Sequence, residues 1–170
     1  MFQPIHRLAI ASAAIVFVGC SKAPEAAPIP AGFHRFEAVG PFSVAIPDGV
    51  TRLPVIGVDT EVDEFVGDGL RLGFSYGLYG TVPPPQAGSI NYSTGDLEID
   101  GRSGTWVAYE RSPEQVADAL PHAWFGAVRE RARWGAAPAE PVGLTIYLSC
   151  RTKQICDLGP KVAATVRFER

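Results

Sequence analysis

The stretch Leu70-Arg-Leu-Gly-Phe-Ser-Tyr-Gly-Leu78 decides the fold class, because apolar residues alternate with small or polar ones along all of it. A period of two is the pattern of a β-strand that buries one face, here the face of Leu70, and exposes the face of Arg71 and Ser75. The preceding residues, Gly67-Asp-Gly69, are typical of a hairpin turn. Residues 58–66 alternate apolar with acidic residues, so the sequence predicts an antiparallel hairpin over 58–78.

Similar strand signals occur on both sides of this hairpin. Residues 42–46 alternate and stop at Pro47-Asp-Gly49, and residues 97–109 form a second hairpin around Asp100-Gly101. Residues 142–149 are rich in β-branched and aromatic side chains, which favour a strand. Residues 122–134 fit either a helix or a strand, and we favour a strand.

Helical signals are confined to two places. Ser112-Pro-Glu-Gln115 is typical of a helix start, and Pro121 limits that helix to about two turns. Between 152 and 168, Ile155, Leu158, Val162 and Val166 recur at spacings of three and four, with a kink expected at Gly159-Pro160. We therefore expect an α+β fold in which an antiparallel β-sheet of hairpins is covered on one face by a C-terminal helix.

Length and charge limit the function classes. The chain has 170 residues, which favours one domain, and its net charge of −3 argues against nucleic-acid binding. His6 and Arg7 precede eleven uncharged residues, Leu8–Val18. These residues would form about 16 Å of helix at ~1.5 Å per residue, about half of a bilayer core of about 30 Å. Residues 1–19 are therefore typical of a secretory signal and not of a membrane span.

The end of this segment, Phe17-Val-Gly-Cys-Ser21, resembles the lipobox of bacterial lipoproteins. Val18, Gly19 and Cys20 match that pattern, whereas Phe17 stands where the family usually has Leu. The resemblance implies cleavage before Cys20, lipidation of Cys20 and a lipid anchor in the cell envelope, facing the periplasm. Ser21 implies the outer membrane in a Gram-negative cell. The alternative is an ordinary signal peptide in which Cys20 is incidental.

Beyond Cys20, residues 20–32 form a Pro/Ala-rich tether and residues 33–170 a single globular domain. The domain resembles the PsbP-like superfamily, and within it small exported bacterial proteins. The resemblance rests on Phe42-Ser-Val-Ala-Ile-Pro47, on Gly57-Val-Asp-Thr60 running into Leu72–Gly77, and on a final strand plus helix. It implies the fold alone, because no manganese-cluster or Ran-contact motif of that superfamily matches.

Two cysteines remain if Cys20 carries lipid. Cys150 and Cys156 form an even pair in an exported chain, which predicts a disulfide. A zinc site is the rival interpretation, but the pair has no second Cys or His pair nearby. We expect no metal and no cofactor.

Candidate chemistry is sparse. Gly73-Phe-Ser-Tyr-Gly77 fits G-x-S-x-G, and Asp96 or Asp100 and then His122 follow in hydrolase order, although Ser75 lies within a strand and not in a sharp turn. Asp59, Glu61 and Asp63 share a strand face and are either calcium ligands or, as we favour, a solvated or charge-protected strand. Arg129, Arg131 and Arg133 beside Trp134 fit an anionic partner or, as we favour, a solvated face. The tryptophans Trp106, Trp124 and Trp134 are expected in the core, and His34 on the surface.

The sequence thus predicts a non-enzymatic binding or assembly module of the cell envelope. Its expected partners are the membrane, through the N-terminal lipid, and an envelope protein or small ligand. The alternative is a small serine hydrolase that uses Ser75 and His122.

Overall fold

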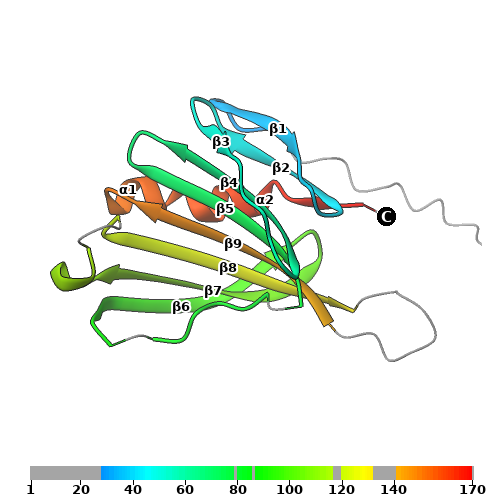
Figure 1. The fold of residues 1–170 in the computed structure, drawn as a ribbon. Helices are drawn as coiled ribbons and strands as arrows, with labels where there is room; N and C mark the ends of the chain where they lie inside the picture. Colours follow the sequence, from blue (N-terminus) through cyan, green and yellow to red (C-terminus); the bar gives the residue numbers. More distant parts are fainter. Residues whose placement is uncertain (1–27, 79, 86, 117–119, 132–140, 170) are drawn as a thin grey trace, which may run out of the picture.

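The computed structural model describes residues 28–78, 80–85, 87–116, 120–131 and 141–169. The predicted signal segment, Cys20 and the first part of the tether lie outside these residues. Within them, ten strands form two sheets, and every strand pair is antiparallel (Figure 1). None of the helices in these ranges is long and apolar enough to cross a bilayer.

The smaller sheet has three strands in the order β1-β2-β10. These are β1 (Phe33–Glu37), β2 (Phe42–Pro47) and β10 (Arg167–Phe168). The larger sheet has seven strands in the order β3-β4-β5-β9-β8-β7-β6. Its strands are β3 (Thr51–Leu53), β4 (Thr60–Gly67), β5 (Leu70–Gly77), β6 (Ser89–Ile99), β7 (Arg102–Arg111), β8 (His122–Arg131) and β9 (Pro141–Cys150).

The predicted hairpin over 58–78 is confirmed as β4 and β5, joined by Asp68 and Gly69. Leu70, Leu72 and Phe74 are buried, whereas Arg71 on the alternate side is exposed. The sequence period therefore identifies correctly which side chains of β5 face the core. The favoured strand at 122–134 is confirmed for 122–131, and residues 132–140 lie outside the described residues.

The core lies between one face of the larger sheet and a cover made of two parts. One part is the small sheet, and the other is a pair of short helices, α1 (Lys153–Cys156) and α2 (Leu158–Ala164). The helices contact β8 and β9, and Figure 1 shows them behind the larger sheet, with β1 and β2 beside them. Trp124 of β8 is 3% exposed and packs against α2 so closely that a Cβ on Gly159 would lie 2.4 Å from its ring. Burial of such large apolar side chains is the main stabilising contribution.

The expected α+β fold with a covering C-terminal helix is wrong, because the protein is β-rich. The apolar spacing over 152–168 belongs to two short helices and a return strand, β10, and not to one helix. Pro160 lies in the first turn of α2, where its missing N–H is tolerated. In the middle of one long helix, Pro160 would interrupt the backbone hydrogen bonds. The helix expected after Ser112 is one turn of 3₁₀-helix, Pro113–Gln115.

Candidate ligand-binding groove

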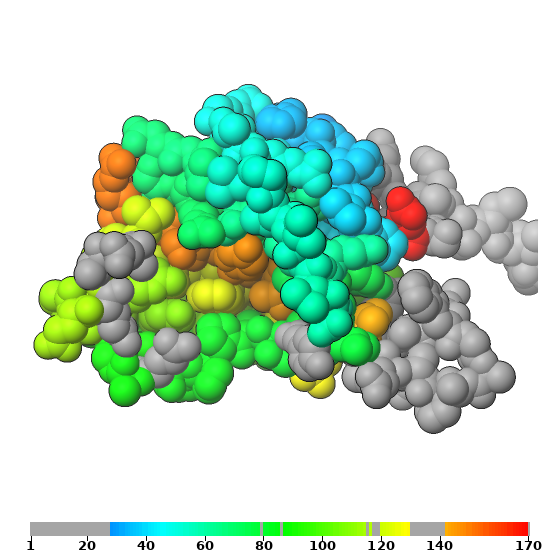
Figure 2. Space-filling model, in the orientation of Figure 1, coloured from blue at the N-terminus to red at the C-terminus, as the bar shows by residue number. Residues whose placement is uncertain are grey.

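The face of the larger sheet that points away from the helices is hollowed. Figure 2 shows the hollow between β4 and β5 on one side and β6 and β7 on the other, with β8 and β9 at its floor. It contains an open groove of about 710 Å³. Ligand sites for small molecules typically have volumes of ~300–1,000 Å³, so the groove has room for one. Its lining includes Glu64, Arg71, Arg111, Leu120, Phe125, Tyr147, Ser149 and Arg151.

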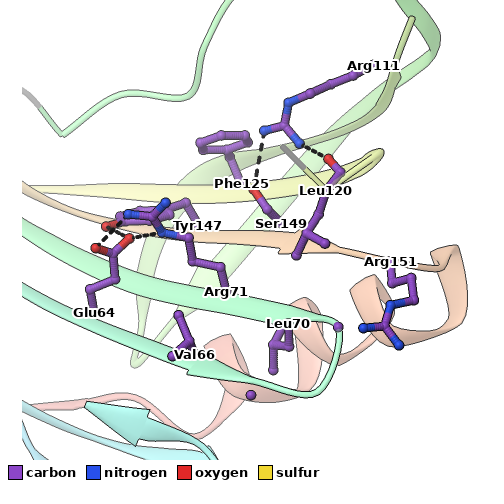
Figure 3. Close-up of a pocket in the computed structure, with 12 residues that line it drawn as sticks. Glu64, Val66, Leu70, Arg71, Arg111, Leu120, Phe125, Tyr147, Ser149 and Arg151 are labelled. Atoms are coloured by element: carbon purple, nitrogen blue, oxygen red, sulfur yellow. Dashed lines mark hydrogen bonds and ion pairs between the residues drawn. The ribbon is translucent and has the colours of Figure 1, made fainter. Parts of the chain in front are cut away.

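Glu64, Arg71 and Tyr147 form a polar cluster on one wall of the groove (Figure 3). Arg71 donates two hydrogen bonds to the Glu64 carboxylate, one from Nε to Oε1 and one from Nη2 to Oε2 at 2.9 Å. The Tyr147 hydroxyl donates a long hydrogen bond of 3.4 Å to Glu64 Oε1. Glu64 is 5% exposed, so this carboxylate is buried with its charge matched by Arg71.

The cluster exists because β5 has glycine where Tyr147 crosses it. Gly73 is the register partner of both Glu64 and Tyr147, and a Cβ on Gly73 would lie 2.1 Å from Cζ of the Tyr147 ring. Glycine at this position therefore leaves the space that the Tyr147 ring occupies.

The electrostatics of the cluster follow from these contacts. The hydrogen bonds from Arg71 hold the pKa of Glu64 below its ordinary value, against the opposing effect of burial. Burial raises the pKa of Tyr147 to about 12, and the nearby Glu64 charge adds to the rise. At neutral pH the cluster is therefore a Glu–Arg ion pair with a neutral tyrosine.

A row of four aromatic rings begins at Tyr147 and runs across the groove face of the sheet. Centroid distances are 6.4 Å for Tyr147–Phe125, 6.1 Å for Phe125–Tyr109 and 6.2 Å for Tyr109–Tyr92, and each pair is stacked. The row crosses β9, β8, β7 and β6 on the same face of the sheet. Stacked rings provide a flat apolar surface, and Phe125 and Tyr147 present part of it to the groove.

Arg111 occupies the opposite wall, at the end of β7. It donates hydrogen bonds to the Leu120 carbonyl and, at 3.2 Å, to Ser149 Oγ (Figure 3). Its guanidinium carbon lies 5.8 Å from the centroid of the Tyr109 ring, within the range of a cation–π interaction. Of the residues that the structure describes, no carboxylate forms an ion pair with Arg111.

Arg151 lies at the mouth of the groove and directly follows Cys150, which forms a disulfide with Cys156. The disulfide is present as predicted, with Cα atoms 5.5 Å apart, and it closes the turn between β9 and α1. Arg151 pairs with Asp68 at 3.1 Å, and the two side chains are 65% and 93% exposed. Such an exposed pair is weak and exchangeable.

The residues of the hydrolase alternative are not brought together. Ser75 is in register with Thr145 and thereby with Ala127, on the groove face, and His122 pairs with Cys150 on the core-facing side. The two side chains thus belong to opposite faces of the sheet. Asp96 lies on β6, four strands from β5, or about 19 Å at ~4.8 Å per strand.

Asp100, the other acidic residue of that alternative, accepts a hydrogen bond from the Phe168 backbone N–H at 3.1 Å. His122 lies 3.7 Å from Glu110, and His34 forms an exposed pair with Asp48. The Asp100 contact holds β10 against the turn between β6 and β7.

In the acidic stretch 59–63, the Asp63 carboxylate has protein partners. Asp63 is 2% exposed and binds the Arg52 guanidinium and the Val39 N–H, so the expected solvated strand is wrong at this residue. Within the described ranges, no group of three or more His, Cys, Asp or Glu is arranged to hold a metal.

Of the proposed basic stripe, Arg129 is exposed near the far end of β8. The side chains of Arg131, Arg133 and Trp134 lie outside the described residues. Trp124 is in the core and Trp106 packs against it, as expected.

Sequence reasoning missed the residues that define the groove, above all Arg111, Phe125, Tyr147 and Ser149. Alternation along each strand places Tyr147 and Ser149 on the same face of β9. The missing information was the strand order, because β9 inserts between β5 and β8.

A comparison with protein-family models finds none that matches the chain, and a comparison with curated proteins finds no match either.

Proposed function

We propose that this chain is a lipid-anchored protein of the cell envelope whose domain binds a small ligand in the groove and performs no catalysis. The observation that carries the proposal is the composition of the groove. A flat aromatic floor with polar and charged groups on its walls is the usual make-up of a ligand site.

The anchor part of the proposal is supported by the sequence alone. The lipobox resemblance at Cys20 and the Pro/Ala-rich residues 20–32 lead into β1, which begins at Phe33. Thirteen tether residues at ~3.1 Å each would hold the domain up to about 40 Å from the bilayer, far enough for the groove to remain accessible.

The non-catalytic part is supported by the separation of Ser75 from His122 and Asp96. A serine nucleophile needs its base within hydrogen-bond reach, and these three residues are on opposite faces or distant strands. Tyr147 and Glu64 satisfy each other and Arg71, which is typical of a structural cluster.

Mass measurement of the mature N-terminus tests the anchor. We expect a chain that begins at an acylated Cys20 and sediments with membranes, and a Cys20→Ala variant that accumulates unlipidated. An unmodified Cys20 in the exported wild-type protein would overturn the anchor.

Native mass spectrometry of the exported protein tests the groove. We expect a copurifying small molecule that is lost in Ser149→Trp, which fills the groove. It should be retained in Ser103→Trp, a matched change at an exposed position of β7 outside the groove. Equal retention by both variants would contradict binding in the groove, and stoichiometric fluorophosphonate labelling of Ser75 would favour the hydrolase alternative.

A further inference from the structure

We propose that the groove holds an oxyanion group, a phosphate or a carboxylate, at Ser149 between Arg111 and Arg151, with the apolar body of the same ligand on Phe125 and Tyr147. This inference rests on the proposed function and specifies the chemistry of its ligand.

The first argument is the concentration of positive charge. The whole chain has a net charge of −3, yet the groove is lined by three arginines and one carboxylate, Glu64. Even with Asp68 at the mouth, the groove is positive within an acidic protein. A hollow lined by one sign of charge concentrates ions of the opposite sign.

Arg111 is the centre of this charge. Its two hydrogen-bond partners among the described residues, a backbone carbonyl and the Ser149 hydroxyl, are neutral, and it lies against the Tyr109 ring. A guanidinium has five N–H donors in a planar fork that matches two oxygens of a phosphate or carboxylate. Donors remain after these two bonds, and Figure 3 shows the Arg111 guanidinium beside Ser149.

The other arginines have different roles. Arg71 is held by two hydrogen bonds to Glu64, so its charge is already matched within the fold. Arg151 is two residues beyond Ser149, about 6.6 Å along the chain at ~3.3 Å per residue. Its exposed pair with Asp68 is weak, so an anion at Ser149 competes for it readily. The oxyanion therefore belongs between Arg111 and Arg151 and not beside Arg71.

The rest of the groove is suited to an apolar body. Leu120, Phe125 and the ring of Tyr147 line it on the same side as Ser149. An inorganic ion would leave these surfaces uncovered. The ligand class is thus an aryl or similar apolar group that carries a phosphate or carboxylate.

Calorimetric titration of the exported full-length protein tests the assignment with four probes: phenyl phosphate, benzoate, inorganic phosphate and phenol. We expect phenyl phosphate or benzoate to bind more tightly than either phosphate or phenol alone. Whichever of the two binds more tightly identifies the oxyanion.

Arg111→Ala should weaken that binding roughly 10- to 100-fold, as expected for lost charge-assisted hydrogen bonds. Arg111→Lys should restore it only in part, because lysine lacks the planar fork. Arg129→Ala is the matched control, since it removes the same charge near the far end of β8 and should not change affinity. Circular dichroism shows whether each variant is folded. If Arg111→Ala does not fold, Arg111→Lys still tests the assignment.

Two results would overturn the inference. If phenol binds as tightly as phenyl phosphate and benzoate, the groove is an apolar site, and the proposed ligand-binding function survives without the oxyanion. If no anionic probe binds, the proposed oxyanion site is wrong. The native mass spectrometry experiment then still tests the proposed ligand-binding function independently.

Discussion

At the scale of single residues, Tyr147 connects the core of the sheet to the groove. Burial raises its pKa to about 12, and the Glu64 carboxylate adds to the rise. We expect absorbance titration at 295 nm to show a tyrosine ionisation near pH 12. Tyr147→Phe should remove this step, and Tyr109→Phe should leave it in place. Glu64→Gln should lower the Tyr147 pKa, because it removes a negative charge that opposes the phenolate.

The same shift links Tyr147 to stability. Its folded-state pKa lies above the unfolded value of about 10, so the folded state favours the neutral form. That contribution is fully present below pH ~10 and is lost as the pH rises toward 12. Urea unfolding between these pH values should show a smaller loss of stability for Tyr147→Phe than for the wild type. Equal losses would contradict the raised pKa of Tyr147.

The sequence predicts which face of a strand each side chain occupies, but not which side chains of other strands it contacts. The period of two along 70–78 places Arg71 and Gly73 on the side away from the core, as observed. It cannot show that Tyr147 lies over Gly73, because that contact depends on the register between β5 and β9, some seventy residues apart in the chain. Register is set by the assembled sheet and not by local propensity.

At the scale of elements, the contact between α2 and β8 limits what Gly159 tolerates. A Cβ at this position would lie 2.4 Å from the Trp124 ring, which is itself packed in the core. Alanine is favoured over glycine within helices by ~1 kcal/mol, but we expect Gly159→Ala to destabilise the protein by roughly 1–3 kcal/mol through overpacking. Chemical denaturation measures the change, and Lys161→Ala at an exposed position of α2 should have little effect. A more stable Gly159→Ala variant would contradict the close packing.

The disulfide is the second constraint on the helical segment. Cys150 and Cys156 are 0% and 6% exposed and enclose five residues that include most of α1. The chain-entropy model gives about 2 kcal/mol for so short a loop. We expect reduction to lower the melting temperature by roughly 4–8 °C. The double variant Cys150→Ala/Cys156→Ala should not respond to reductant, and an unchanged wild-type melting temperature would exclude a stabilising role.

The C-terminal segment also explains why the fold class was predicted incorrectly. Apolar residues at spacings of three and four are typical of one amphipathic helix. Here Ile155 belongs to α1, Leu158 and Val162 to α2, and Val166 to the chain that returns to β10. All four contribute to the same core. The spacing therefore predicts correctly which residues are buried, but it does not indicate one continuous helix. The small sheet supplies the cover that the helix was expected to provide.

At the scale of the whole molecule, the sequence predicts the hairpins and the face of each strand but not the strand order. Consecutive segments β4–β5 and β6–β7 pair as neighbours, and these pairings follow from two-residue turns and alternation. The insertion of β9 between β5 and β8 joins distant parts of the chain. The groove floor is formed where β5, β9 and β8 lie side by side. No local sequence motif therefore predicts the groove.

The two sheets should behave as one unit, because partly buried polar contacts connect them. Asp63 of β4 accepts a hydrogen bond of 2.9 Å from the Val39 N–H in the β1–β2 connection, and Asp100 accepts one from Phe168 of β10. We expect hydrogen exchange to give the amides of β2 and β9 the same free energy of opening, as for a single cooperative domain. Asp63→Ala leaves the Val39 N–H and Arg52 without their partner, and it should lower both values together by about 1–3 kcal/mol. A loss of protection in β2 alone would instead mean that the small sheet unfolds independently, and Asp48→Ala, at an exposed carboxylate outside this connection, provides the control.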